Sequence, residues 1–344
     1  MPQPTRLIPI AKDDFECIDH LMDHDQYWAI EGALAANRPL LVRGEPGLGK
    51  TQLAYAAAAM LNRPIKHFTI DSATEARDLL WTFDAIQRLA DAQVASHLYA
   101  DRELLRNELA VTKYVRPGPL WWAIHWESAF NIDPNSAPNQ PTGWTKDKGI
   151  VILIDEIDKA ESNVPNGLLE VLGSRQFTPY GWSHAIRSEQ SNDKKSNDPP
   201  LIIITTNEER TLPDPFLRRC CVLNLTLPDC VQDNGADLEE RDRIKFVEYF
   251  VELGKAHFPK VILEEQIRAC AELLLEDRKY AVLNQVSPKP GPAEFLDFLR
   301  AMISLVKKQL GDGKHSKSVV ENAYNEISQN IRQFVFSKSK KPDE

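Results

Sequence analysis

The stretch LLVRGEPGLGKTQLAYAAAAML, residues 40–61, joins an apolar run to an alanine-rich segment through a loop that contains three glycines and a lysine. The leucine- and valine-rich run predicts a buried strand, and the alanine-rich segment predicts a helix. The spacing Gly44-x4-Gly49-Lys50-Thr51 is that of a phosphate-binding loop, which requires a strand before it and a helix after it. The stretch therefore predicts an α/β fold built around a phosphate site.

The residue types of this loop fit the chemistry of a nucleoside triphosphate. Glycines let successive backbone N–H groups turn toward phosphate oxygens, where side chains would block the approach. Lys50 can reach the β and γ phosphates, the Thr51 hydroxyl can ligate Mg²⁺, and the helix N-terminus adds partial positive charge. The residues expected to bind the nucleotide are Gly44, Glu45, Pro46, Gly47, Leu48, Gly49, Lys50, Thr51 and Gln52.

The absence of a guanine-binding motif indicates which base the nucleotide carries. P-loop proteins of the Ras type resemble one another in an Asn-Lys-x-Asp stretch that reads guanine, and no such stretch occurs in this sequence. We therefore expect ATP rather than GTP, with Mg²⁺ as the metal ion.

The composition favours a globular, cytoplasmic protein. Of the 344 residues 42% are hydrophobic, which suffices for a large domain and a smaller one. Neither a long apolar run nor a signal-peptide pattern occurs, so no membrane span is expected. The five cysteines show no CxxC spacing, which argues against disulfide and zinc frameworks. With a formal net charge of -9 we do not expect a nucleic-acid partner, although a local basic channel in an assembly stays open.

Four further apolar runs predict strands, at 64–71, 149–156, 199–207 and 221–227. Helical segments alternate with these runs, including the long stretch 75–112. Such alternation is typical of an open parallel sheet flanked by helices. We therefore predict an α/β fold class with a helix-flanked parallel sheet.

A change of pattern after residue 227 divides the chain. Beyond it the strand-like runs stop, and amphipathic helices are predicted at 238–257, 262–277, 292–309 and 317–336. The expected domains are an N-terminal lead with a first helix at 1–37, an α/β nucleotide-binding core at 38–228, a helical lid at 229–336 and a charged tail at 337–344.

Two polar segments rich in turn formers, 131–148 and 188–198, are predicted as exposed loops inserted into the core. Trp126, Trp144 and Trp182 lie in or beside inserted segments. Their side chains either pack in the core or at a subunit interface, or grip a partner peptide.

The run VILIDEID, 151–158, places two carboxylates at the carboxyl end of a buried strand. Open α/β sheets bind their ligands at this edge. Asp155 can hold the metal ion through water, and Glu156 can polarise a water that attacks the γ phosphate. An acidic pair alone could be a simple strand end, but its place after a phosphate-binding loop favours the catalytic interpretation.

Two later elements extend the expected site. Asn207 ends the third strand and can hydrogen-bond the attacking water or the γ phosphate, although a turn-forming asparagine is the alternative. Arg218 and Arg219 precede the next strand. They are either a solvated strand end or guanidinium groups aimed at the γ phosphate of a neighbouring subunit, where such a group strongly accelerates hydrolysis.

The stretches GEPGLGKT, VILIDEID, TTN and LPDPFLRR resemble, in order and spacing, the Walker A, Walker B, sensor 1 and arginine-finger motifs of AAA+ ATPases. VRPGPLWWAI at 115–124 and the segment 158–181 further resemble the MoxR branch of that family. The resemblance covers roughly residues 26–310 and is weaker in the helical lid.

This resemblance implies a ring, usually a hexamer, with ATP between subunits and Arg219, with Arg218, completing the neighbour's site. The segments 75–114 and 176–198 occupy the places of insertions that shape the pore face of such rings. MoxR-type ATPases are similar to chaperones that remodel partners, often partners with a von Willebrand A domain, and some act beside effectors in bacterial defence.

The lid departs from the pattern of the family. Family members often carry a sensor 2 arginine at a helix start, and the segment 286–302 offers none there. Lys289 and Arg300 are the alternatives.

Three functions follow as hypotheses. The first is an ATP-hydrolysing ring that remodels or activates a partner protein. The second is a scaffold that assembles on ATP and recruits an effector, with hydrolysis as a timer. The third, a nucleic-acid motor or loader, is disfavoured by the acidic composition.

Overall fold

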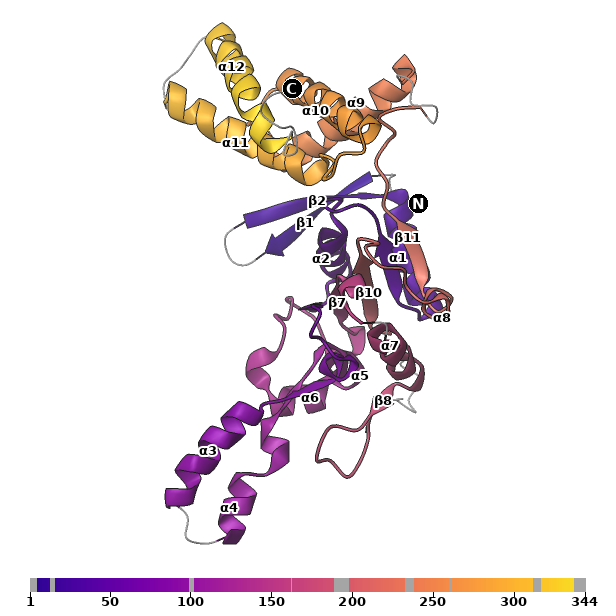
Figure 1. Cartoon of the computed structure of the whole chain (residues 1–344), viewed down its shortest axis with the longest axis vertical. Coiled ribbons are helices and arrows are strands. Elements are labelled where there is room, and N and C mark those ends of the chain that lie inside the picture. Colours follow the sequence, from indigo (N-terminus) through magenta and orange to yellow (C-terminus); the bar gives the residue numbers. More distant parts are fainter. Residues whose placement is uncertain are drawn as a thin grey trace. The chain divides into compact units, whose positions relative to one another are not determined.

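The computed structural model describes residues 5–12, 16–98, 102–161, 163–188, 198–232, 238–259, 261–311 and 317–336. The chain forms two compact units. The sheet unit comprises Asp23–Arg43 and Thr51–Asn224, and the helical unit comprises Met1–Met22, Gly44–Lys50 and Leu225–Glu344 (Figure 1). The phosphate-binding loop is thus grouped with the C-terminal residues, and the domain boundaries expected from the sequence stay predictions.

The sheet unit is built on five parallel strands in the order β11-β3-β10-β7-β4. Each strand lies inside a run that the sequence predicts as a strand, so the predicted α/β fold class is confirmed. The bounds are Leu40–Arg43 (β3), Ile65–Thr69 (β4), Val151–Asp155 (β7), Leu201–Thr206 (β10) and Cys221–Asn224 (β11).

The strand register brings polar residues together at the carboxyl edge of the sheet. Ile204 of β10 pairs with Ile154 of β7, so the next residues, Thr205 and Asp155, are neighbours. On the other side of β7, Thr69 of β4 pairs with Asp155. Asp155 therefore lies between two strands that each present a hydroxyl-bearing residue.

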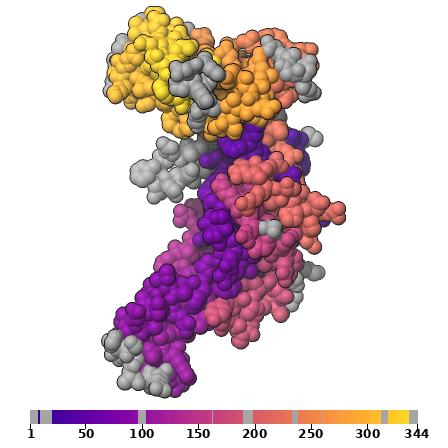
Figure 2. Space-filling view, viewed as in Figure 1, coloured from indigo at the N-terminus to yellow at the C-terminus, as the bar shows by residue number. Residues whose placement is uncertain are grey.

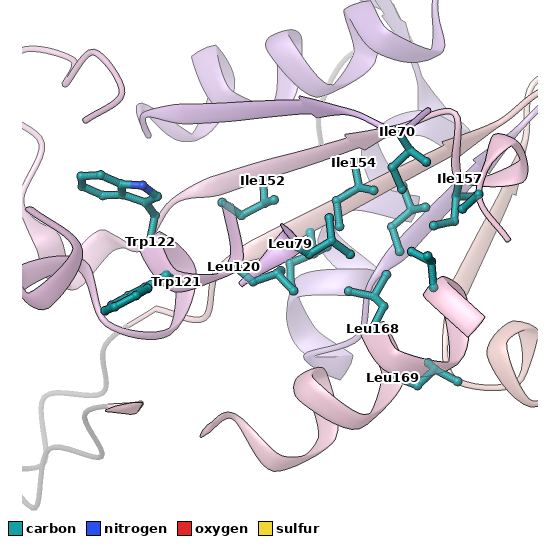
Figure 3. Close-up of a cluster of buried hydrophobic side chains, with 14 of the residues drawn as sticks. Ile70, Leu79, Leu120, Trp121, Trp122, Ile152, Ile154, Ile157, Leu168 and Leu169 are labelled. Carbon is teal, nitrogen blue, oxygen red and sulfur yellow. The ribbon is translucent and has the colours of Figure 1, made fainter. Parts of the chain in front are cut away.

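A large apolar core covers one face of the sheet. Ile152 and Ile154 of β7 are fully buried and belong to the same cluster as Leu120 (Figure 3). The alternating residues Val151 and Leu153 are equally buried, so β7 is covered on both faces. Burial on both faces explains why this strand is a continuous apolar run in the sequence.

Helices cover the sheet within this unit. Helix α1 (His24–Ala36) contacts β3, β10 and β11, and α5 (Pro119–Ile124) contacts β4 and β7. Helix α1 begins where the Asp23 carboxylate accepts a 2.7 Å hydrogen bond from the Gln26 N–H, as a helix N-cap does. The other elements here are α2 (Lys50–Leu61), α6 (Trp126–Ile132), the 3-10 turn η6 (Ile157–Lys159), α7 (Asn163–Ser174), α8 (Asp214–Leu217) and the antiparallel pair of β8 (Gln176–Phe177) and β9 (Ile186–Arg187).

The stretch 75–112 is not one continuous helical segment, so this prediction is corrected. A strand, β5 (Trp81–Phe83), interrupts it and pairs antiparallel with β6 (Val115–Pro117). The sequence Trp-Thr-Phe favours a strand, and the Asp84 carboxylate then caps the following helix by accepting from the Gln87 N–H at 2.8 Å. The helical parts are α3 (Ala85–Leu98) and α4 (Arg102–Glu108), both labelled in Figure 1, and the 3-10 turns η2 (Ala76–Leu79) and η3 (Val111–Tyr114).

Trp126 and Trp182 pack against the core, and Trp144 packs against Trp126. The ring centroids of Trp126 and Trp144 are 4.6 Å apart, and the Trp144 Nε1–H donates to the Gly149 carbonyl at 2.9 Å. Trp182 lies edge-on to the buried Trp121, at 5.7 Å between centroids. The segment 131–148 contains the turns η4 (Pro134–Ser136) and η5 (Lys146–Lys148), and residues 189–197 of the second predicted loop lie outside the described residues.

The helical unit contains the predicted C-terminal helices. These are α9 (Glu240–His257), α10 (Glu264–Leu283), α11 (Pro292–Leu310) and α12 (Lys317–Val335), drawn in orange to yellow in Figure 2. Phe250 and Phe295, 5.0 Å apart, lie at the centre of their apolar core. The N-terminal lead adds a two-stranded sheet of β1 (Thr5–Lys12) and β2 (Glu16–Asp23), which the sequence did not predict.

The predicted charged tail, 337–344, lies outside the described residues. Of the helices within the described ranges, none combines the length and the apolar character that a membrane crossing requires.

Gly118, which precedes α5, lies so close to neighbouring backbone atoms that a side chain there should be destabilising. A Cβ atom there would lie 2.5 Å from the Asp78 carbonyl oxygen and 2.7 Å from the Leu79 carbonyl carbon. Because both atoms belong to the backbone, we expect Gly118→Ala to lower the free energy of unfolding by about 1–3 kcal/mol.

The matched control is Gly32→Ala in the interior of α1, where an added Cβ meets no atom within 4 Å. Removing a helix glycine should raise the free energy of unfolding by roughly 0.5–1 kcal/mol. Urea unfolding curves of the two variants measure both effects, and equal curves would contradict the packing argument.

Candidate functional site

The phosphate-binding loop adopts a backbone that only glycine tolerates well. Gly44, Gly47 and Gly49 have φ values of 151°, 81° and 83°, all in the region that residues with side chains rarely adopt. A Cβ atom on Gly44 would also lie 2.6 Å from the Leu225 carbonyl oxygen. The glycines are therefore explained by the path of the chain around the loop.

Lys50 lies inside this loop and is 7% exposed. Its Nζ donates to the carbonyl oxygens of Gly44 and Glu45, at 2.7 and 2.9 Å. Helix α2 begins at Lys50, so its N-terminal N–H groups follow directly on the loop. Two residues further on, the Gln52 Oε1 is buried and makes no hydrogen bond with a described residue.

Thr51 and Asp155, the expected metal ligands, lie together. The Thr51 hydroxyl donates to the Asp155 carboxylate, at 3.0 Å to Oδ2 and 3.2 Å to Oδ1. Hydroxyl and carboxylate oxygens are the hard ligands that Mg²⁺ prefers. The described residues contain no group of three or more His, Cys, Asp or Glu that could hold a metal ion alone. The pair therefore fits Mg²⁺ held by few protein ligands together with phosphate oxygens.

Asp155 receives two further contacts within the sheet unit. Thr205 of β10 donates from its hydroxyl to Asp155, and the His67 Nε2 of β4 lies 3.3 Å from Asp155 Oδ2. Burial raises the pKa of Asp155, but the hydrogen bonds with His67, Thr205 and Thr51 outweigh it, so its pKa lies below the usual value. Asp155 therefore stays ionised at neutral pH.

Sequence reasoning missed His67. Its ring is also held by Tyr55 of α2, whose hydroxyl lies 3.1 Å from His67 Nδ1. Only the register of β4 against β7, which pairs Thr69 with Asp155, places His67 near this edge, and the register is not visible in the sequence.

Glu156 follows β7 in an uncommon conformation. Its φ and ψ are 62° and 49°, in the left-handed region, and its N–H donates to the Thr205 hydroxyl at 2.9 Å. For a residue other than glycine, asparagine or aspartate this conformation costs free energy and often marks a functional site. The Glu156 carboxylate pairs with the Lys159 ammonium group at 2.5 Å.

Asn207 is positioned by a residue that sequence reasoning did not assign. The Asp158 side chain is 2% exposed, and its Oδ2 accepts hydrogen bonds from the N–H groups of Asn207 and Glu209, at 3.1 and 3.0 Å. A buried carboxylate thus holds the backbone after β10. The signal in the sequence is the third acidic residue of the run VILIDEID.

Arg218 and Arg219 lie at the end of α8 and are exposed. Neither guanidinium forms an ion pair or a hydrogen bond with a residue in the described ranges. The chain alone therefore does not bring the two arginines to the residues at the carboxyl edge of the sheet.

Two cations of the helical unit contact the phosphate-binding loop. Lys289 Nζ lies 3.1 Å from Glu45 Oε1, and Arg278 Nη2 lies 2.6 Å from Glu45 Oε2. Arg300, the other alternative from the sequence, pairs instead with Asp297 at 2.7 Å and is exposed. Sequence reasoning missed Arg278, because nothing in the sequence near it indicates a contact with the loop.

Comparisons with known proteins bear on this site. A family profile described as an AAA domain of the dynein-related subfamily matches residues 39–220, more than half of the 344 residues. The chain is similar in structure to a candidate ATPase from Cytophaga hutchinsonii, with 14% identity and a TM-score of 0.34, over 90% of this chain and 79% of that chain. It is also similar to a variant of RuvB from Thermotoga maritima, with 15% identity and a TM-score of 0.40, over 88% and 67% of the two chains. No curated protein matches the chain.

The family match, residues 39–220, includes the phosphate-binding loop, the strand that ends in Asp155, the loop that carries Asn207, and Arg219. The chain belongs to the AAA domain family, in its dynein-related subfamily.

Proposed function

We propose that the protein is an ATP-hydrolysing AAA+ ring ATPase of the MoxR type that remodels or activates a partner protein. The observation that carries this proposal is the hydrogen-bonded group of Thr51, Asp155, Thr205 and the Glu156 backbone at the carboxyl edge of the sheet. This group supports the proposal because it holds the Thr51 hydroxyl beside the Asp155 carboxylate and ties the backbone of Glu156 to the next strand.

The proposed binding step uses the loop and its first helical turn. The backbone N–H groups between Gly44 and Lys50, with the Lys50 ammonium group, bind the phosphates of ATP. Thr51 and Asp155 hold Mg²⁺, which would offset the charge that develops on the phosphate oxygens. Because Asp155 stays ionised, it can serve as a ligand at neutral pH.

The proposed hydrolytic step uses Glu156, Asn207 and a neighbouring subunit. The Glu156 carboxylate takes the proton of the attacking water, and Asn207 orients that water. Arg219, with Arg218, stabilises the transition state in the next subunit. Both side chains are exposed and form no ion pair with described residues. This supports the role, because an arginine that acts on the nucleotide of another subunit cannot be engaged within its own subunit.

A hexameric ring follows in this proposal from the MoxR resemblance of the segments 115–124 and 158–181. On the same resemblance we propose that the insertions 75–114 and 176–198 shape the pore face of this ring. Ile86 and Leu89 of α3, which are 84% and 63% exposed, give the first insertion apolar side chains that a protein partner can bind. A von Willebrand A domain or an effector module is the proposed partner.

One observation favours a second candidate, an ATP-gated scaffold that recruits an effector. The Glu156 carboxylate is paired with Lys159 at 2.5 Å, and this contact must break before the paired oxygen can accept a proton from water. In this candidate function the protein assembles when it binds ATP and hydrolyses ATP slowly, so that hydrolysis sets only how long the assembly lasts. The net charge of -9 argues against the third candidate, a nucleic-acid motor.

We expect Glu156→Gln to bind ATP without hydrolysing it, because the loop and Asp155 remain while the base is lost. The expected fall in turnover is about 100-fold or more. Phosphate release and ATP affinity by calorimetry measure the two effects. Glu161→Gln, at an exposed carboxylate of the same segment, is the control and should turn over normally. Normal turnover in Glu156→Gln would remove Glu156 from this role.

Arg219→Ala should abolish hydrolysis while sparing ATP affinity, because the guanidinium acts on the nucleotide of another subunit. Mixing it with Lys50→Ala subunits should restore part of the activity, since one subunit supplies the arginine and the other an intact loop. Light scattering with ATP and Mg²⁺ establishes that the mixed subunits form rings. Co-assembled rings without restored activity would count against a shared site.

Asp158→Ala should lower the free energy of unfolding by about 1–3 kcal/mol, because the N–H groups of Asn207 and Glu209 lose their acceptor. It should also lower turnover more than ATP affinity, since Asn207 is displaced. Asp158→Asn keeps an acceptor oxygen and is the matched control, with a smaller loss expected in both. Urea unfolding and phosphate release measure these effects, and equal losses in the two variants would contradict the positioning role.

A further inference from the structure

Within the helical unit, one carboxylate of the phosphate-binding loop is held by two cations. Glu45 Oε2 accepts from Arg278 Nη2 at 2.6 Å, and Oε1 accepts from Lys289 Nζ at 3.1 Å. Arg278 belongs to α10, and Lys289 belongs to the turn between α10 and α11. Each oxygen of the carboxylate therefore has its own cation, and the cations come from different elements.

Arg278 is fixed in place. Its side chain is 9% exposed, and its Nη1 donates to the Pro290 carbonyl oxygen at 2.9 Å while Nη2 contacts Glu45. Acceptors from two separate segments thus hold the two ends of the guanidinium. A buried guanidinium held in this way is already oriented toward Glu45 and loses little freedom in the contact.

The Glu45 carboxylate poses an electrostatic problem for the loop. Burial raises the pKa of Glu45, but the hydrogen bonds and charges of Arg278 and Lys289 outweigh it, so the pKa lies below its usual value and the group is ionised at neutral pH. An unpaired negative charge several ångströms from a triphosphate would weaken binding about tenfold or more at an effective dielectric constant of about 20. The contacts of Arg278 and Lys289 with Glu45 would offset this charge.

A second carboxylate lies close to the same loop. A Cβ atom on Gly47 would be 3.2 Å from the Ala293 Cβ of α11 and 3.7 Å from Glu294 Oε2. Glu294 accepts a hydrogen bond from the Gly291 N–H at 3.1 Å, which fixes it at the start of α11. Two carboxylates thus lie beside the loop, and the loss of either Arg278 or Lys289 removes one of the two positive charges that contact Glu45.

We propose that Arg278 and Lys289 are positioning residues that neutralise Glu45, so that the phosphate-binding loop can accept the negative charge of a nucleoside triphosphate. The inference rests on the proposed function, because it requires the loop to bind ATP. In this role the two cations act through Glu45 and do not themselves touch the phosphates.

The test is the affinity for ATP, measured by calorimetry with Mg²⁺ on the full chain. Arg278→Gln and Lys289→Gln should each weaken binding about tenfold, with the larger loss for the buried arginine. Adding Glu45→Gln to either variant should return the affinity to within about threefold of the wild type, because the charge that needs neutralising is gone.

The matched control is Arg300→Gln. It removes the same charge from the same unit, but Arg300 is 59% exposed, pairs with Asp297 and has no contact with the loop. Its ATP affinity should stay within about twofold of the wild type. An equal loss in this variant would assign the effect to net charge and overturn the proposal.

Whether Glu45→Gln restores the ATP affinity of the single variants decides between the possible roles of the two cations. If a double variant binds ATP as weakly as its single parent, the cation contacts the nucleotide itself and the proposal is overturned. Unchanged affinity in both single variants overturns it as well. Thermal unfolding establishes that each variant is folded. If Arg278→Gln does not fold, the Lys289→Gln pair decides, because Lys289 is 39% exposed.

Failure of this inference is distinguishable from failure of the proposed function. A wild-type chain that does not bind ATP overturns both. A wild-type chain that binds ATP, with no rescue by Glu45→Gln, overturns the inference alone.

Discussion

The rest of the sheet edge depends on the hydrogen bonding of one carboxylate, Asp155. Its side chain is 13% exposed, and a carboxylate buried to this extent is costly unless donors surround it. The partners come from three elements that are distant in the sequence: Thr51 of α2, His67 of β4 and Thr205 of β10. Satisfying one charge therefore fixes the first turn of α2 and the ends of two strands.

The parts of this arrangement that could be predicted from the sequence are those that local patterns determine. The strands β7 and β10 are buried on both faces and are continuous apolar runs, so their position and their fold class follow from the sequence alone. The loop is recognised from its glycines and from Lys50, because its chemistry lies within eight consecutive residues. Thr51 and Asp155 were paired through the general rule that parallel strands present ligands at their carboxyl ends.

The remaining residues could not be predicted, because their roles arise from tertiary contacts. Nothing distinguishes His67 from other strand residues until the register of β4 against β7 is known. Arg278 is 233 positions from Glu45 in the sequence, so no local pattern connects the two residues. The interruption of 75–112 by β5 was missed for a related reason, since a favourable run of only three residues does not indicate a strand until its pairing with β6 is known. The sequence contains the residues of such contacts but not their proximity.

The two units differ in their intrinsic fluorescence, because their aromatic residues differ. All seven, from Trp28 to Trp182, belong to the sheet unit, whereas the core of the helical unit is built on phenylalanines such as Phe250 and Phe295. Tryptophan fluorescence, excited at the long-wavelength edge of the protein absorption band, therefore reports on the sheet unit alone. Circular dichroism of the backbone reports on both units. A difference between these two signals during unfolding would resolve the two units without any added label.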